Sequence, residues 1–146
     1  MLWSHYGAKH RRICLGFDLK KDLARKVKYE DRRIRAKLDE QRNPLKLDKT
    51  LQDLLLCKKF RHCQYEQEIR VIVPLKEAVK DGQMHFYPLN DNLQLTEVIL
   101  GPLCSESLDA VRRLTRTQHP HAVVFKARLG FKFFKVVPDE RTVPRC

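Results

Sequence analysis

The sequence from residue 96 to residue 137 reads TEVILGPLCSESLDAVRRLTRTQHPHAVVFKARLGFKFFKVV. Its first five residues, Thr96–Leu100, predict a short strand that stops at Gly101-Pro102. Ser105 is expected to cap a helix that runs to about Thr115, because acidic side chains follow the cap and arginines lie near the end of the helix. The buried stripe of this helix is predicted to be Leu108, Val111 and Leu114.

Two further strands are predicted downstream, at Ala122–Arg128 and Phe131–Val137, joined at Leu129-Gly130 as a hairpin. Near the N-terminus, residues Arg12 to Asp18 alternate between apolar and other side chains. This alternation predicts a strand with one well-buried face, made of Ile13, Leu15 and Phe17.

The middle of the chain has a weaker pattern. Short helices are predicted around Asp22–Lys26 and Asp31–Glu40, and leucines at helical spacing predict a firmer helix over residues 48–59. From Tyr65 to Val73 the alternation is typical of a strand.

A turn is predicted at Asp81-Gly82, with a short strand at Met84–Tyr87 after it. The complete pattern has about six short strands and two or three helices, without βαβ alternation. It predicts an α+β fold with a mainly antiparallel sheet, formed as a single domain over residues 1–146.

Composition limits the class of protein. Apolar residues make up 42% of the 146 residues, enough for a core that needs no disulfide or metal. The five cysteines are scattered without Cys-x-x-Cys spacing, which is typical of reduced thiols and predicts a cytoplasmic protein. No run approaches the roughly 18 apolar residues of a membrane span, and no secretion signal or glycine-rich nucleotide loop is evident. We therefore expect no metal, no cofactor and no membrane partner.

The net charge is +12, and it is unevenly distributed along the sequence. Residues 1–62 hold 18 basic and 8 acidic side chains, whereas residues 63–146 hold 12 and 10. The chain thus has a basic half and a near-neutral half. A field of this sign attracts nucleic acid, anionic lipid or an acidic protein surface. The alternative is a solvated face that only keeps the protein in solution.

One basic segment stands out as a candidate binding surface. It contains a single aromatic residue, Tyr29, so attraction to backbone phosphates or to an acidic protein partner suits it better than base readout. No recognised DNA-reading motif is present. The basic side chains of the segment are Lys20, Lys21, Arg25, Lys26, Lys28, Arg32, Arg33, Arg35 and Lys37.

The candidate catalytic residues are Glu66, Glu68 and Arg70, which would share one face of the predicted strand. Two carboxylates and a guanidinium could hold a metal for phosphodiester cleavage. They could also stabilise a glycosyl cation, as the paired glutamates of ADP-ribosyltransferases do, or clamp a phosphate beside a general base. The alternative is a structural Glu–Arg pair on a solvated sheet face.

His5 is the fourth catalytic candidate. Beside Glu68 it would resemble an acid–base or NAD-binding arrangement. The alternative is a half-buried aromatic cluster of Trp3, His5 and Tyr6.

Three motifs together resemble the bacterial domain-of-unknown-function family 2971. They are Trp3-Ser4-His5-Tyr6 with Leu15-Gly16-Phe17, then Tyr65-Glu66-Gln67-Glu68-Ile69-Arg70, and then Glu97-Val98-Ile99-Leu100-Gly101. The family usually has a Trp at the place of Cys63. Its members also carry further residues before the Trp-x-His-Tyr strand, so a short variant or a fragment is expected here. The resemblance implies a bacterial or mobile-element setting and no particular chemistry.

These observations favour a small basic binding protein of a phage or other mobile element that engages nucleic acid or a nucleoprotein complex. No enzymatic activity is expected under this hypothesis. The alternative is an enzyme that acts on NAD, a nucleotide or a phosphodiester through Glu66, Glu68, Arg70 and His5.

Overall fold

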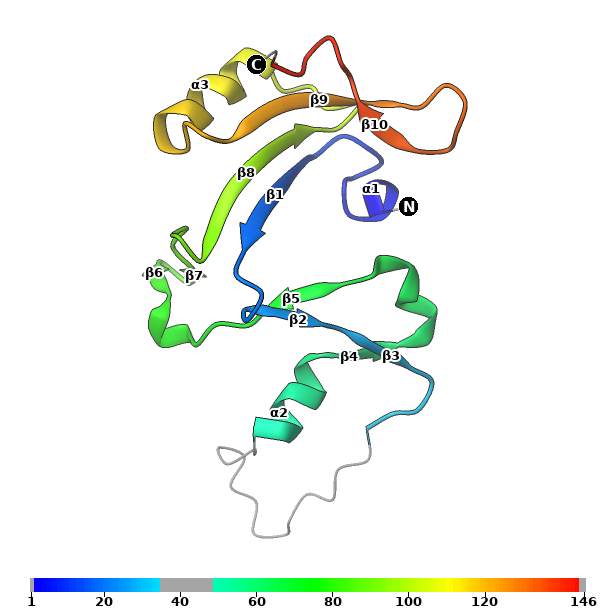
Figure 1. The fold of residues 1–146 in the computed structure, drawn as a ribbon, viewed down its shortest axis with the longest axis vertical. Coiled ribbons are helices and arrows are strands. Elements are labelled where there is room, and N and C mark those ends of the chain that lie inside the picture. Colours follow the sequence, from blue (N-terminus) through cyan, green and yellow to red (C-terminus); the bar gives the residue numbers. More distant parts are fainter. Residues whose placement is uncertain (1, 35–48, 145–146) are drawn as a thin grey trace, which may run out of the picture. The chain divides into compact units, whose positions relative to one another are not determined.

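The computed structural model describes residues 2–34 and 49–144, and these form an α+β fold (Figure 1). The chain divides into two compact units. Unit 1 comprises Met1–Lys20 and Phe86–Cys146, and unit 2 comprises Lys21–His85. The described residues contain ten strands in several small, mostly antiparallel sheets, which confirms the predicted fold class. Within these residues, no helix is long and apolar enough to cross a membrane.

Unit 1 is built on a four-stranded sheet in the order β1-β8-β9-β10. Its outer pairs, β1 with β8 and β9 with β10, are antiparallel, whereas β8 and β9 are parallel. The helix α3 makes the crossover between the parallel strands, so one βαβ unit exists where none was expected. The elements of the unit are α1 (Leu2–His5), β1 (Ile13–Leu19), β8 (Leu93–Leu100), α3 (Leu108–Gln118), β9 (Val123–Leu129) and β10 (Val136–Pro138).

The core of unit 1 lies between α3 and the two central strands. Leu100 is fully buried there, and Leu108 and Val111 pack against the cluster of Val98, Leu100, Cys104 and Val124. The prediction that Leu114 belongs to the buried stripe of the helix is wrong, because Leu114 is 67% exposed. Thr115 is buried instead.

The helix cap is also shifted from its predicted place. The N-cap is Ser107, two residues after Ser105, and its Oγ accepts a hydrogen bond from the amide of Ala110 at 3.4 Å. The helix therefore begins at Leu108, and it ends at Gln118 rather than near Thr115. A capping serine is needed where the chain actually turns into the helix, and the sequence offers two candidates two residues apart.

The strand β1 forms as predicted, but its apolar face is not buried. Ile13, Leu15 and Phe17 are 38%, 51% and 37% exposed. Two of them pair with core residues, Ile13 with Leu100 and Leu15 with Val98. However, β1 is an edge strand, whereas α3 contacts β9 on the other side of β8. The edge of the sheet therefore receives little cover from the helix.

Two other segments of unit 1 were expected to be strands but do not form strands. Trp3, Ser4 and His5 lie in the short helix α1. The segment Phe131–Phe134 forms the loop before β10, which spans only Val136–Pro138. The loop is closed by the amide of Gly130, which donates to the carbonyl of Lys135 at 2.8 Å. This closure keeps the loop out of the β9–β10 ladder.

Unit 2 consists of short paired elements with little core. Among its described residues only Val27 is buried, at 3% exposure. Antiparallel pairing joins β2 to β5, and parallel pairing joins β3 to β4. The elements are β2 (Ala24–Lys26), β3 (Lys28–Glu30), α2 (Lys49–Leu56), β4 (Lys58–Phe60), the 3₁₀ helices η1 (Arg61–Glu66) and η2 (Leu75–Glu77), β5 (Ile69–Val71), β6 (Val79–Asp81) and β7 (Met84–Phe86), whose last residue belongs to unit 1.

The helix predicted at Asp22–Lys26 is wrong, because the β2 residues of this segment pair with β5. Residues 31–34 of the helix predicted at Asp31–Glu40 are not helical, and its other residues lie outside the described part. The helix predicted over residues 48–59 is confirmed as α2. It ends at Leu56 because the next residues join β3 as β4.

The strand predicted from Tyr65 to Val73 shrinks to Ile69–Val71. Tyr65 and Glu66 belong to the 3₁₀ helix η1, and Gln67 after it takes the left-handed conformation at φ 46°. A period-two pattern of side chains does not exclude a 3₁₀ turn, so alternation alone misplaced the start of the strand. The turn at Asp81-Gly82 is confirmed, with Gly82 at φ 58°.

Candidate functional site

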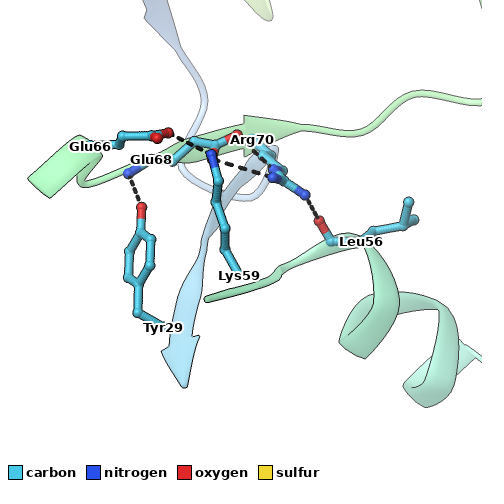
Figure 2. Close-up of polar contacts among 6 residues, drawn as sticks. All are labelled: Tyr29, Leu56, Lys59, Glu66, Glu68 and Arg70. Carbon is cyan, nitrogen blue, oxygen red and sulfur yellow. Dashed lines mark hydrogen bonds and ion pairs between the residues drawn. The ribbon is translucent and has the colours of Figure 1, made fainter. Parts of the chain in front are cut away.

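Lys59 lies at the centre of a network of charged side chains in unit 2 (Figure 2). Its Nζ lies 2.5 Å from Oε2 of Glu66 and 3.2 Å from Oε2 of Glu68. The side chain of Glu66 is only 8% exposed, whereas that of Lys59 is 27% exposed, so the carboxylate is largely shielded from water and the lysine is not. Sequence reasoning named both glutamates but not the lysine that joins them.

Arg70 completes the network from β5. Its Nε donates to Oε1 of Glu68 at 2.8 Å, and its Nη2 donates to Oε2 of the same carboxylate at 3.2 Å. Its Nη1 donates to the carbonyl of Leu56, at the end of α2. A two-point contact with a carboxylate is the strong geometry for arginine, and here the same guanidinium also holds a helix terminus.

The backbone brings these groups together in a way that a regular strand would not. Glu66 is in η1, the left-handed Gln67 turns the chain, and Glu68 precedes β5. The amide of Glu68 donates to the hydroxyl of Tyr29 on β3, at 2.8 Å. The network therefore ties β3, β4, β5, η1 and α2 to one another in a unit that has almost no apolar core.

The pKa values in this network move away from neutrality. The hydrogen bonds from Arg70 and then from Lys59 lower the pKa of the Glu68 carboxyl. The hydrogen bonds to Glu66 and Glu68 raise the pKa of the Lys59 ammonium well above its usual range. Both groups thus keep their charge near pH 7. A general acid or base works best with a pKa near the working pH, so the lowered pKa of Glu68 does not favour an acid–base role for this carboxyl.

We expect the Glu68 carboxylate to make stability depend on pH. Its pKa is lowered by folding, so its contribution is present above the unfolded pKa of about 4.3 and is lost as the pH falls through the folded value. At neutral pH Glu68→Gln should cost on the order of 1 kcal/mol. Thermal melts between neutral and acid pH should show the two proteins converging as the pH drops.

The matched control is Glu77→Gln on η2, where the glutamate forms no ion pair with any described residue. This variant should stay within about 0.5 kcal/mol of the wild type at every pH. Parallel melting curves for wild type and Glu68→Gln from neutral to acid pH would contradict the role assigned to Glu68.

His5 belongs to a different unit from this network. It lies on α1 in unit 1, whereas Glu66, Glu68 and Arg70 belong to unit 2. The pairing of His5 with Glu68 therefore stays a prediction.

The basic segment contributes to a groove of about 550 Å³ in unit 2, which we call the basic groove. Three of its cations, Arg25, Lys26 and Lys28, were named from the sequence. The other two, Lys49 on α2 and Lys58 on β4, come from elements far along the chain. The complete lining is Ala24, Arg25, Lys26, Lys28, Lys49, Thr50, Asp53, Leu54, Cys57 and Lys58.

Two of the five cations in the basic groove are paired with an acid. Arg25 lies 3.2 Å from Asp53, and Lys58 lies 2.5 Å from Glu30. The remaining three, Lys26, Lys28 and Lys49, form no ion pair with any described residue. Lys28 also stands in register with Lys58 across the β3–β4 ladder, so two like charges are held side by side.

The other predicted basic residues either do not line the basic groove or lie outside the described residues. Arg32 and Arg33 line a second pocket of unit 2, of about 490 Å³, which shares Lys58 with the basic groove. Lys20 is the last residue of the first segment of unit 1, and Lys21 begins unit 2. Arg35 and Lys37 lie outside the described residues.

The charge excess is shared equally between the two units. Unit 2 contains 17 basic and 11 acidic residues and unit 1 contains 13 and 7, so each carries +6. The imbalance between residues 1–62 and 63–146 does not follow the fold, because the N-terminal 20 residues belong to unit 1. Both units therefore carry a net positive charge that attracts an anionic partner.

No protein-family model, curated protein or solved structure matches this chain. The resemblance to family 2971 accordingly stays a prediction. Within the described residues, no group of three or more His, Cys, Asp or Glu side chains is placed to hold a metal ion.

Proposed function

We propose that this chain is a nucleic-acid-binding protein and that its basic groove holds the phosphate backbone. The observation that carries the proposal is the set of three lysines, Lys26, Lys28 and Lys49, which form no ion pair with any described residue; of these, Lys28 also acts through its charge on Glu30. Like charges along the walls of a groove add their fields and repel one another. A phosphate that enters the groove relieves this repulsion and releases counterions.

The composition of the basic groove favours contact with phosphates over contact with bases. The described residues that line it include no aromatic side chain on which a base would stack. Lysine ammonium groups contact phosphates as point charges, without the planar geometry that reads a base edge. Binding at this groove should therefore be insensitive to nucleotide sequence.

The charged network around Lys59 has a supporting role in this proposal. It fixes β3 and β4, which carry Lys28 and Lys58, and the C-terminal end of α2, the helix that begins at Lys49. The enzyme alternative, with NAD, a nucleotide or a phosphodiester as substrate, has less support. The two candidate glutamates form ion pairs with Lys59 and Arg70. The pKa of Glu68 is lowered, whereas an acid–base catalyst needs a pKa near neutrality.

The biological setting is proposed from the resemblance to family 2971 alone. A small basic protein of a phage or other mobile element that acts within a nucleoprotein complex agrees with sequence-independent binding to the phosphate backbone.

Salt dependence provides the direct test. Duplex DNA of about 20 base pairs, followed by fluorescence anisotropy, should bind the full chain with a log–log salt slope of about −4 if four or five phosphates are neutralised. Unrelated duplex sequences should give the same slope and the same affinity within a few fold.

An absence of duplex binding in low-salt buffer, or binding that ignores salt, would contradict the proposal. Polyglutamate is the informative competitor, because it has the charge of an acidic protein surface without phosphates. If polyglutamate binds as tightly as the duplex at equal charge, an acidic protein is the better partner for the groove.

A further inference from the structure

The loop between β9 and β10 in unit 1 exposes three phenylalanines beside three cations. Phe131 and Phe133 are 92% and 71% exposed, and Phe134 is fully exposed. Lys132 and Lys135 alternate with them in the sequence, and the guanidinium of Arg128 lies 4.7 Å from the ring centroid of Phe131. Exposed aromatic side chains in such a group are costly in water and mark binding surfaces.

Part of this loop lines a pocket of about 680 Å³ that lies wholly within unit 1. Trp3 on α1 contributes a third aromatic ring to the lining, beside Phe133 and Phe134, and we call this site the aromatic pocket. Its lining also has polar members, of which His10 is one. The Nδ1 atom of His10 is buried without a hydrogen-bond partner among the described residues.

The segments that supply the aromatic pocket carry positive charge only. Residues 2–12 and 123–138 contain no Asp or Glu. The acid that follows them, Asp139, is paired with Arg141 at 2.8 Å. The segments contain seven basic side chains, Lys9, Arg11, Arg12, Lys126, Arg128, Lys132 and Lys135, of which Lys135 lines the pocket itself. Lys126 donates to the carbonyl of Cys104, and Arg128 lies over the ring of Phe131. The ligand that fits this site is therefore an anion with planar, stackable groups.

We propose that the aromatic pocket binds unpaired nucleotides of a single-stranded nucleic acid, with bases stacked on Trp3, Phe133 and Phe134 and phosphates held by the surrounding cations. Stacking platforms among cations are the usual means of binding single strands without sequence preference. The inference rests on the proposed function, because it makes unpaired strands the preferred class of nucleic acid. It adds a second site, since the basic groove has no aromatic lining.

An anionic membrane surface is the competing occupant for exposed aromatics beside lysines. The lining of the pocket favours the nucleic acid. A nucleobase has polar edges that suit a site with His10 and Ser4 in its lining, whereas an acyl chain offers no hydrogen-bonding group. The site is also hollowed, which suits a single inserted base.

The test compares a single-stranded oligothymidine, an abasic oligomer with the same number of phosphates, and a duplex. Trp3 is the only tryptophan of the chain, so quenching of its fluorescence reports a base in the pocket. We expect quenching by oligothymidine and none by the abasic oligomer. Phe133→Ala with Phe134→Ala should weaken oligothymidine binding roughly 10-fold to 100-fold. Duplex binding should stay within about 2-fold, because it uses phosphates alone.

The matched control is Phe86→Ala, which removes a half-exposed aromatic ring outside the pocket and should leave all affinities unchanged. The pocket phenylalanines are largely exposed, so circular dichroism and melts of the double variant should match the wild type. Equal affinity for oligothymidine and the abasic oligomer, with intact duplex binding, would overturn this inference and leave the proposed function standing. Loss of binding to phosphatidylserine vesicles in the double variant, with oligothymidine binding intact, would overturn it in favour of a membrane surface. Failure of all three nucleic acids to bind at low salt would overturn both proposals.

Discussion

Gly101→Ala is expected to destabilise unit 1 by about 3 kcal/mol, because a methyl group at this position has no space. A Cβ atom would lie 2.3 Å from the carbonyl oxygen of His10 and 2.8 Å from that of Arg12. Both obstacles are backbone atoms, so no side-chain rotation can relieve the clash. Gly101 also follows Leu100, the fully buried centre of the core.

The close approach at Gly101 is held in place from both sides. The amide of Gly101 donates to the carbonyl of Arg12 at 2.9 Å, and the amide of Leu103 donates to the carbonyl of His10 at 3.0 Å. A shift large enough to admit the methyl group would break these bonds. Thermal or urea melts should therefore show a fall of roughly 6–12 °C in Tm.

Gly82→Ala provides the matched control for the glycine substitution. Gly82 takes φ 58°, so alanine is strained there, but a Cβ would meet no atom within 4 Å. The expected cost is only about 1 kcal/mol. If the two alanine variants lose the same stability, the crossing of residues 10–12 over Gly101 is looser than the structure has it.

The elements that could be predicted from the sequence are those whose signal is local. The strand ending at Leu100, the helix from Leu108 and the strand from Val123 were each predicted from a local apolar pattern, although this pattern did not locate the start of the helix. Their mutual arrangement was not predictable in the same way. The parallel pairing of β8 with β9 depends on how α3 packs back on the sheet, and this is decided by contacts between distant residues.

The loop at Phe131–Phe134 shows how a local pattern can mislead. Alternating Phe and Lys residues have the period of a strand with one apolar face, so the segment was predicted as a strand. The rings remain largely exposed, with the Arg128 guanidinium over Phe131 and with Phe133 and Phe134 in the lining of the aromatic pocket. The same pattern is what a surface for aromatic and anionic ligands requires. Period alone does not distinguish burial within the fold from contact with a ligand.

The sequence predicted part of the charged network, but the structure brings its residues together through a different backbone geometry. Glu66, Glu68 and Arg70 were expected to share a strand face, but a 3₁₀ helix and a left-handed residue bring them together. Lys59 was missed because it joins them only through the fold. The basic groove, too, could be predicted only in part from the sequence. Lys49 and Lys58 line the same groove as Lys28 only because β3 pairs with β4. No local sequence pattern predicts that pairing.

Reversing two groove charges, Lys26→Glu with Lys49→Glu, is expected to weaken duplex binding by roughly 100-fold in low salt. Two attractive contacts with phosphates become repulsive, and the log–log salt slope should become shallower by about 2. Both lysines lack an ion-pair partner among the described residues, so the substitutions break no salt bridge there. The melting temperature should stay close to that of the wild type.

The matched control reverses two lysines of unit 2 outside the basic groove, Lys76→Glu with Lys80→Glu. Both double variants change the net charge from +12 to +8, so they weaken the long-range field of the protein equally. Their difference isolates the position of the charges, because only the groove variant places carboxylates where phosphates would lie. The control should lose less than about 5-fold, through the weaker long-range attraction alone. Equal losses in the two variants would mean that net charge and not the basic groove holds the nucleic acid.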